Sequence, residues 1–321
     1  MTLPRILAAL LLAPLALGCG FTQLAVKRRL PAEINIDPKK TMAVAAIGGQ
    51  GGEALAAELS AALMGTHRFT LVERQHLDAA MAELKLSASG KVSDETAMTF
   101  GELTGAATLV TGEVLTASYN ESVRSDPSQC AREGKVVPCT NNTRSAAAKL
   151  EVTLKVVATE SGHLLAAKTL HAEEARSTTA TDHDPPEIHG QDEMLGTCRS
   201  AVIAQFLRVV APYEVEERVL LRQDGDLPEL ERGNNYARLG DWEAAGAQYQ
   251  GAIAAAKKPE LKAAAQYNLS VALGMTGEFD QAMQLVEEAY AVDADGVYHE
   301  HAQHLREMKE QAARMREQES K

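Results

Sequence analysis

The spacing of apolar residues predicts alternating strands and helices over the first two thirds of the chain. Residues 42–47 are a short apolar run bounded by glycine, and residues 150–156 alternate between apolar and polar side chains. Both patterns are typical of β-strands. Apolar residues recur at helical spacing in residues 53–64 and 75–86. A last helix is expected at about residues 190–211, just before a proline.

The predicted order of elements is β-α-β-α-α-β-β-β-α. Two crossovers followed by an antiparallel set of strands imply one mixed sheet with helices packed against it. Residues 119–145 form a polar insert in the hairpin region and contain two prolines. Residues 19–40 also contain two prolines and show no periodicity, so we expect a tether there and an α/β domain over residues 41–212.

The C-terminal part of the chain contains an internal repeat. Residues 233–253 and 267–295 align so that Gly-Asp-Trp matches Gly-Glu-Phe and two alanines coincide. Their offset is close to the period of about 34 residues that is typical of tetratricopeptide (TPR) repeats, which are pairs of packed helices. Residues 226–321 are therefore predicted to form an all-α TPR-like domain. Either a helix over residues 297–317 or the α/β domain is expected to cover its open end.

Repeats of this kind bind protein segments in a groove lined by their first helices. The residues predicted to bind a partner in that groove are Asn234, Asn235, Tyr267 and Asn268. The sequence leaves open which of them would contact the partner.

The N-terminus resembles a bacterial lipoprotein signal peptide. Arg5 precedes an apolar run over residues 6–17 that is too short to span a bilayer, and the run leads into Leu-Gly-Cys at Cys19. In a lipoprotein, residues 1–18 are removed and Cys19 carries the acyl chains that anchor the protein. The alternative is ordinary signal cleavage nearby, with Cys19 removed or free. Gly20, rather than aspartate, follows the cysteine, and by resemblance to lipoprotein sorting this points to the outer membrane.

The charge of the chain argues against one class of partner. Its formal net charge is −12 at pH 7, and the strongly basic stretch Lys27–Arg29 is short. Such an acidic chain is a poor candidate for nucleic-acid binding. The basic stretch lies beside the predicted anchor, where anionic headgroups or solvent would surround it.

The remaining cysteines are predicted to have structural roles. Cys130 and Cys139 flank a short polar segment, which suits a disulfide in an oxidising compartment. Cys198 shares a helical apolar stripe with Val202 and Phe206, so a buried thiol is expected. The chain has no C-x-x-C, which disfavours a thioredoxin-type activity.

One glycine-rich turn has the form of a nucleotide-binding motif. Gly49, Gly51 and Ala54 fit G-x-G-x-x-A after a predicted strand, and Glu73 follows at about the 20-residue spacing of a ribose-binding acid. However, the alternation of strand and helix stops too early for a Rossmann domain, and an exported protein meets little free dinucleotide. A dinucleotide-binding enzyme therefore stays a remote alternative.

The histidine-rich and carboxylate-rich segments do not match a metal motif. His301 and His304 share a helix face, but H-E-x-x-H fails because Gln303 occupies the position of the second histidine. These histidines are predicted to be solvated. Residues 182–189 combine three carboxylates with two histidines and are predicted to be a polar loop rather than a cation site. No metal and no cofactor is expected.

Two motifs occur in order within the predicted α/β domain. They are F-x-L-V-E-R-x-x-L over residues 69–77, followed by Glu83–Leu84, and G-x-L-x-G-A-x-x-L-V-T-G over residues 101–112. Together they closely resemble the CsgG/LpoB-like domain of bacterial envelope lipoproteins, and the resemblance extends over roughly residues 40–212. In that setting, Glu73 and its neighbour Arg74 would cap a strand end or form an ion pair.

The resemblance also raises the outer-membrane pore that CsgG forms from hairpins of several protomers. Such a pore would require about four membrane strands per protomer, each alternating apolar with polar residues. The hairpin insert at residues 119–145 and the segment 172–192 are polar instead. A pore is therefore disfavoured.

Taken together, the sequence predicts a non-enzymatic, lipid-anchored adaptor of the bacterial envelope that faces the periplasm from the outer membrane. It would bind envelope proteins through its α/β and TPR-like modules, for example as an activator of a cell-wall synthase or as an assembly factor. The alternative is a CsgG-type subunit of an outer-membrane secretion or transport complex. Whether the chain forms a homo-oligomer is left open.

Overall fold

The computed structural model describes residues 20–37, 41–73, 79–80, 94–188 and 190–320. The chain divides into two compact units. The sheet unit comprises Pro31–Tyr213 with Met315–Lys321, and the helical unit comprises Met1–Leu30 with Glu214–Arg314. Each has its own hydrophobic core, so the predicted α/β mixed-sheet domain and helical-repeat domain are both present. None of the described helices is long and apolar enough to cross a membrane.

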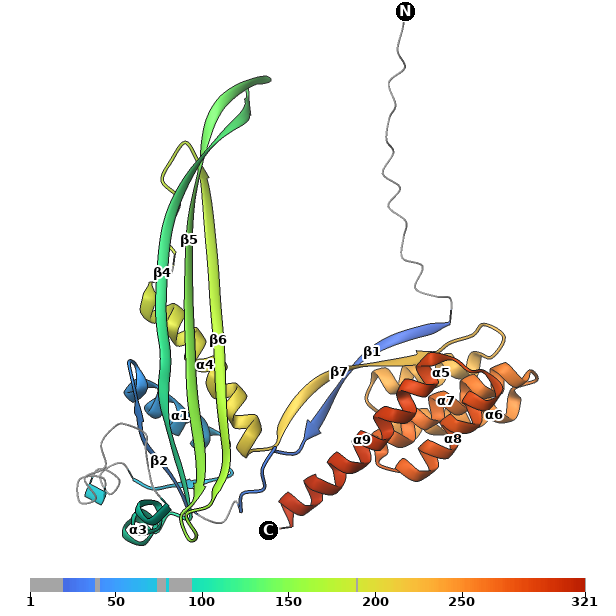
Figure 1. The fold of residues 1–321 in the computed structure, drawn as a ribbon. Helices are drawn as coiled ribbons and strands as arrows, with labels where there is room; N and C mark the ends of the chain where they lie inside the picture. Colours follow the sequence, from blue (N-terminus) through green and yellow to red (C-terminus); the bar gives the residue numbers. More distant parts are fainter. Residues whose placement is uncertain (1–19, 38–40, 74–78, 81–93, 189, 321) are drawn as a thin grey trace, which may run out of the picture. The chain divides into compact units, whose positions relative to one another are not determined.

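The sheet unit is built on a five-stranded mixed sheet (Figure 1). β2 pairs in parallel with β3 and β4, whereas β4, β5 and β6 are antiparallel to one another. This is the change from parallel to antiparallel pairing that the predicted order of elements implies. In spatial order the strands are β3 (Thr70–Leu71), β2 (Thr41–Gly48), β4 (Thr108–Arg132), β5 (Lys135–Ala158) and β6 (Leu164–Thr181).

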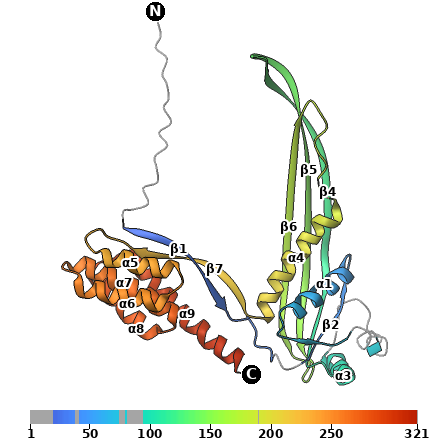
Figure 2. The same ribbon diagram turned by 180° about the vertical axis from the view of Figure 1, so that it is seen from behind.

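Two helices, α1 (Gly52–Gly65) and α4 (Gln191–Val210), cover one face of this sheet (Figure 2). α1 packs on β2, whereas α4 packs on β5 and β6, where Leu150 and Val152 are among the residues of β5 that alternate inward. The helix expected at residues 190–211 is thereby confirmed. It ends where the sequence predicts, because Pro212 cannot continue it.

A third helix, α3 (Asp94–Thr104), packs on different residues of the sheet. Phe100 is fully buried in a small cluster with Ala43 and Leu109. Ala43 alternates along β2 with residues of the main core, so this cluster lies on the other face of the sheet. The helix expected at residues 75–86 lies outside the described residues except for 79–80, which are helical.

The polar insert expected at residues 119–145 is strand rather than loop. Pairing of β4 with β5 continues from Ser118↔Lys149 to Arg132↔Lys135, and the strands extend beyond α4 (Figure 1). The sequence pattern misses this because no core covers either face here, so apolar alternation is not required. A proline has no N–H to donate to a neighbouring strand. Pro127 and Pro138 are tolerated because each lies where its strand pairs with a single described neighbour.

The helical unit combines helix pairs with a two-stranded ribbon. The strands of the ribbon are β1 (Phe21–Leu30) and β7 (Tyr213–Arg222), of which Tyr213 is counted in the sheet unit. The helices are α5 (Pro228–Arg238), α6 (Trp242–Ala255), α7 (Pro259–Thr276), α8 (Phe279–Val292) and α9 (Gly296–Glu319), the last of which belongs to this unit as far as Arg314.

The internal repeat seen in the sequence is a structural repeat. Gly240 and Gly277 both adopt the left-handed backbone conformation at the turn between the two helices of each pair, with φ of 78° and 93°. The paired alanines are also equivalent, since Ala245 and Ala282 are both fully buried. Small residues at these positions let the two helices of a pair approach closely. The two helix pairs are α5–α6 and α7–α8.

The expected tether over residues 19–40 is wrong for Phe21–Leu30, which form β1. Within β1, Leu24 and Val26 are buried in the core of the helical unit, whereas Ala25 and Lys27 are exposed. This alternation is short and includes charged residues, so the sequence alone does not distinguish it from an irregular segment. The ribbon also means that the helical unit is not purely α-helical.

Candidate functional site

A strand of the chain itself occupies the groove lined by the first helices of the two repeats. Asn268 on α7 donates through Nδ2 to the main-chain oxygen of Arg222 at 2.9 Å and accepts from the Arg222 main-chain N–H at 2.7 Å. Asn234 on α5 donates to the same oxygen at 3.0 Å. The Tyr267 hydroxyl donates to the main-chain oxygen of Leu220 at 2.8 Å. These side chains therefore hold β7 as a groove would hold a peptide.

The predicted partner-binding role is wrong for two of the four groove residues, Asn234 and Asn268, and stays a prediction for the other two. Asn234 is 1% exposed and Asn268 is fully buried, so an outside partner cannot reach them, whereas the buried Tyr267 forms part of the wall of the pocket described below. Asn235, which precedes the turn between α5 and α6, is exposed and accepts a side-chain hydrogen bond from Arg238. The sequence identifies the correct groove positions but not their occupant, because β7 precedes the repeats and carries no motif.

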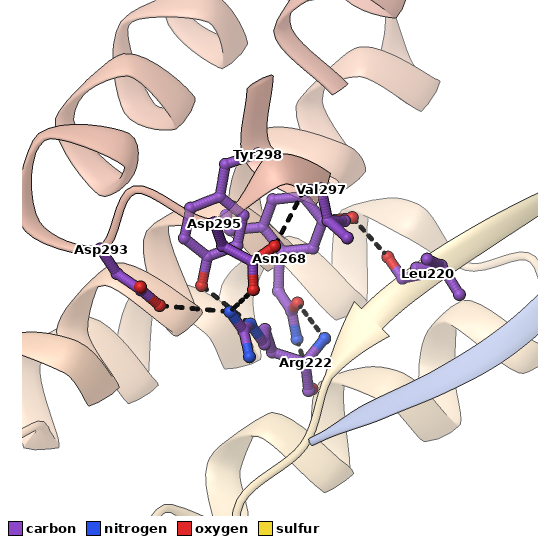
Figure 3. A network of polar contacts seen from close by, with 8 residues as sticks. Leu220, Arg222, Asn268, Asp293, Asp295, Val297 and Tyr298 are labelled. Carbon is purple, nitrogen blue, oxygen red and sulfur yellow. Dashed lines mark hydrogen bonds and ion pairs between the residues drawn. The ribbon is translucent and has the colours of Figure 1, made fainter. Parts of the chain in front are cut away.

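The side chain of Arg222 joins the end of β7 to the start of α9 (Figure 3). Its guanidinium donates to Tyr298 Oη at 2.9 Å, to Asp295 Oδ2 at 2.6 Å and to Asp293 Oδ2 at 3.2 Å. It also lies 4.1 Å from the ring centroid of Phe21 on β1. One cation thus links both strands of the ribbon to the helices, by charge-assisted bonds and by a cation–π contact.

A pocket of about 220 Å³ lies between β7, α7 and α9. Aliphatic, thioether and aromatic side chains form most of its wall, and two glutamates, an arginine and two histidines supply the polar groups. The lining residues are Glu217, Arg218, Val219, Leu220, Tyr267, Val271, Met275, Val297, Glu300, His301, His304 and Met308. All of them belong to the helical unit. A mainly apolar concavity with a few polar groups is the usual form of a binding site.

Glu217 places a fixed negative charge in this pocket. Arg28 on β1 binds it with two hydrogen bonds, from Nε at 2.9 Å and from Nη2 at 3.0 Å. His304 Nε2 lies 3.6 Å from Glu217 Oε1. Burial raises the pKa of Glu217, but the contacts with His304 and Arg28 outweigh burial and hold the pKa at about 2. The carboxylate is therefore ionised over the physiological pH range.

His301 contributes a neutral imidazole to the pocket wall. Burial, with a smaller contribution from neighbouring His304, lowers the pKa of His301 to about 4. Its Nε2 atom is buried and has no hydrogen-bond partner among the described residues. The prediction that His301 is a solvated histidine is therefore wrong. α9 packs this face of the helix against α7, where the ring lies edge-on to Tyr267 at 5.4 Å.

The cysteines behave as the sequence predicts. Cys130 and Cys139 are joined by a disulfide near the tip of the β4–β5 hairpin. Cys198 is buried in the core of the sheet unit, and burial raises the pKa of its thiol. A protonated, inaccessible thiol is unreactive. Cys19 and residues 1–18 lie outside the described residues, so the lipidation of Cys19 stays a prediction.

The glycine-rich turn is explained by the packing of the sheet. Gly49 and Gly51 have φ of 84° and 79°, in the region that favours glycine. A Cβ atom on Gly49 would lie 2.3 Å from the main-chain oxygen of Val114 on β4. Glu73 is exposed, and its expected partner Arg74 lies outside the described residues. The turn therefore joins β2 to α1 closely against β4, as required for a sheet-to-helix turn.

The loop after β6 forms contacts with the neighbouring hairpin. Asp182 accepts a hydrogen bond from the main-chain N–H of Thr140 at 2.8 Å and pairs with Arg132. These bonds fasten the end of β6 to the β4–β5 hairpin. Within the described ranges no group of three or more histidine, cysteine or acidic residues could hold a metal ion. His189 lies outside those ranges.

The comparison with protein families identifies the sheet unit. Residues 36–183, a little under half of the chain, match the model described as "Curli production assembly/transport component CsgG". The chain therefore contains a CsgG-like domain, as the sequence predicts. Residues 231–314 match a model described as a domain of unknown function (DUF6340). The TPR assignment of the helix pairs stays a prediction.

Several solved structures are similar over part of the chain. Escherichia coli LpoB is 14% identical, with a TM-score of 0.30 over 45% of this chain and 61% of LpoB. The chain thus spans about three fifths of the length of that relative. The LpoB C-terminal domain from Salmonella enterica is 14% identical, with a TM-score of 0.28 over 43% of this chain and 84% of that domain. Lipoprotein GNA1162 from Neisseria meningitidis is 13% identical, with a TM-score of 0.30 over 52% of this chain and 97% of that lipoprotein. The search of curated proteins gives no match.

Proposed function

We propose that this protein is a non-enzymatic, lipid-anchored adaptor of the bacterial envelope, attached through Cys19 to the outer membrane and facing the periplasm. The signal-peptide sequence and the CsgG-like domain support this setting. The adaptor would act by binding a protein partner, as an activator of a cell-wall synthase or as an assembly factor. Its α/β and helical modules would both contribute surfaces.

The observation that carries the proposal is the pocket beside the strand-filled groove. Because β7 occupies the groove itself, we infer that a partner enters this pocket beside it. Val271, Met275, Val297 and Met308 offer an apolar surface that adapts to the shape of a bound side chain.

The polar groups of the pocket limit what can bind. The unpaired Nε2 of His301 leaves a buried polar atom unsatisfied, which costs free energy until a partner group supplies the hydrogen bond. Glu300 and Arg218 supply charged groups of opposite sign to the pocket wall, and the charge of Glu217 is paired with Arg28. The pocket therefore suits an apolar side chain from a protein segment that also presents a hydrogen-bond donor.

The anchor and the pocket are tested separately. Cys19→Ala is expected to move the protein from the membrane to the soluble fraction of the envelope, and retention on the membrane would refute the lipid anchor. Val297→Phe fills part of the pocket from its wall, and is expected to abolish specific crosslinks to envelope proteins. Val292→Phe makes the same change at an exposed position outside this pocket and is the control. Unchanged crosslinking by Val297→Phe would exclude the pocket as the partner site.

The competing proposal is a CsgG-type subunit of an outer-membrane secretion or transport complex. It is favoured by the description of the matched family as an assembly and transport component. Conductance of the purified protein in planar bilayers would support it over the adaptor.

A further inference from the structure

The described chain begins at Gly20, and its first residues are already built into the helical unit. The main-chain oxygen of Gly20 accepts a hydrogen bond from the N–H of Gln223 at 2.8 Å. Phe21 lies beneath the Arg222 guanidinium and edge-on to Tyr267 at a centroid distance of 6.3 Å. Leu24 is buried in the core of the unit. The chain therefore has no slack between residue 20 and the folded helical unit.

This attachment fixes the predicted lipid anchor to one place on the unit. Cys19 directly precedes Gly20, and one residue spans at most about 3.6 Å. If Cys19 is lipidated, as the proposed function requires, the surface around Gly20 must lie at the level of the lipid headgroups. A conventional tether would instead let the folded part move away from the bilayer.

We propose that the helical unit docks on the bilayer surface through the turn between α5 and α6. Arg238 ties this turn to β1, because its Nη2 donates to Thr22 Oγ1 at 3.2 Å. Thr22 lies two residues after Gly20. The turn and the lipid-attachment point are therefore neighbours within one folded unit.

The side chains of this turn have the composition of a membrane-surface contact. Leu239 is 82% exposed, the highest value for a large apolar residue in the described part of the chain, and Tyr236 is 40% exposed. Gly240 follows in the left-handed conformation and holds Leu239 at the tip of the turn. An exposed leucine enters the acyl boundary, tyrosine favours the interface, and Arg238 can meet lipid phosphate.

Several acidic residues of the unit are held in ion pairs, whereas Asp241 and Glu243 beside the turn are exposed, so the contact made by Leu239 has to outweigh their repulsion from anionic headgroups. Arg222 pairs with Asp293 and Asp295, and Lys258 pairs with Asp226 at 2.9 Å. A single turn contributes a weak contact by itself. It becomes effective because the acyl chains hold it at the surface, where its local concentration is high.

The test uses the full-length lipidated protein in vesicles of phosphatidylethanolamine and phosphatidylglycerol. A polarity-sensitive fluorophore is attached in Leu239→Cys and, as the control, in Glu310→Cys. Glu310 is exposed on α9 and lies twelve residues beyond Tyr298, which at the rise of a helix is about 18 Å along the axis. The Leu239→Cys label is expected to be quenched severalfold more by brominated lipid than the Glu310→Cys label. Aqueous iodide should show the reverse order.

A ten-residue Gly-Ser linker inserted between Cys19 and Gly20 distinguishes docking from anchoring. It is expected to remove most of the lipid quenching at position 239 while the protein stays on the vesicles. Equal lipid quenching at both positions, in a protein whose mass shows the acylated Cys19, would overturn the docking and leave the anchor intact. A mass without acyl chains would overturn the anchor and the docking together.

Discussion

Asn268 donates a side-chain hydrogen bond to Asn234, with Nδ2 3.2 Å from Oδ1, and so joins the first helices of the two repeats. The same two amides hold the main chain of Arg222 on β7. Tyr249 completes the network, since its hydroxyl donates to Asn234 Oδ1 at 2.8 Å. A polar network of this kind, buried and fully paired, specifies one position for the strand.

Replacement of Asn268 should therefore destabilise the helical unit. Asn268→Ala leaves the main-chain N–H and oxygen of Arg222 short of partners in a buried place, and we expect a loss of about 2–3 kcal/mol in the free energy of unfolding. Chemical denaturation followed by circular dichroism measures it. Asn235→Ala is the matched control, because Asn235 is exposed and its loss should cost about 0.5 kcal/mol or less. Equal effects of the two changes would contradict the assignment of β7 to the groove.

The helical unit should lose stability in mild acid through His301. Burial keeps the folded-state pKa of His301 at about 4, below the usual value of 6.5, so the unfolded chain takes up the proton first. The stabilising contribution of the neutral ring is complete above pH 6.5 and is lost as the pH falls from 6.5 towards 4. His301→Gln should flatten the pH dependence of the unfolding midpoint in this window.

Glu217, in the same pocket, should affect the stability of the helical unit at lower pH than His301 does. The pKa of Glu217 is held at about 2, below the usual 4.5, so its contribution is complete above pH 4.5 and is lost as the pH falls towards 2. This window hardly overlaps that of His301, so the two can be separated in one titration. His299→Gln, a change at an exposed histidine of the same helix, is the control and should leave both windows unchanged.

Alanine substitutions at Gly49 and Gly51, in the turn after β2, should separate the cost of backbone strain from the cost of close packing. Gly51→Ala has no neighbouring atom to meet and should cost about 1–2 kcal/mol, the usual penalty for a left-handed alanine. Gly49→Ala adds a collision with the main-chain oxygen of Val114 and should cost about 3 kcal/mol or more. Thermal unfolding of the sheet unit measures both changes. A thermal shift on addition of a dinucleotide would revive the enzyme alternative.

Removal of the disulfide should act on the hairpin tip alone. The pair Cys130→Ser and Cys139→Ser removes a link between strands that lie outside the hydrophobic core. Hydrogen exchange is therefore expected to quicken in residues 128–141, while protection in residues 150–156 stays the same. Faster exchange throughout β5 would show that the tip supports the core of the sheet unit.

Much of the fold follows from local patterns in the sequence. The alternation over residues 150–156 predicts β5, because one face of that strand packs on α4. The proline at residue 212 marks the end of α4 correctly. The equivalence of Gly240 and Gly277 predicts the helix pairs, because only a left-handed residue closes each turn.

The candidate site could be predicted only in part. The sequence places Asn234, Tyr267 and Asn268 on the first helices of the repeats, yet each is buried against β7, more than ten residues earlier in the chain. The pocket assembles Glu217, His301 and Met308 from segments that no motif connects. Residues that lie far apart in the chain and meet only in the folded protein cannot be recognised from the periodicity of apolar residues or from the spacing of a motif.

The sequence by itself determined the strands and helices of the sheet core, the repeat, the disulfide pair and the buried thiol of Cys198, because each depends on near neighbours or on a periodic apolar face. Only the tertiary structure decided that β1 pairs with β7 and that β7 fills the groove. Strand pairing is specified by main-chain hydrogen bonds and by the amides of Asn234 and Asn268, and these partners lie far apart in the chain. The same long-range pairing turned an expected tether into a strand that holds Gly20 on the helical unit.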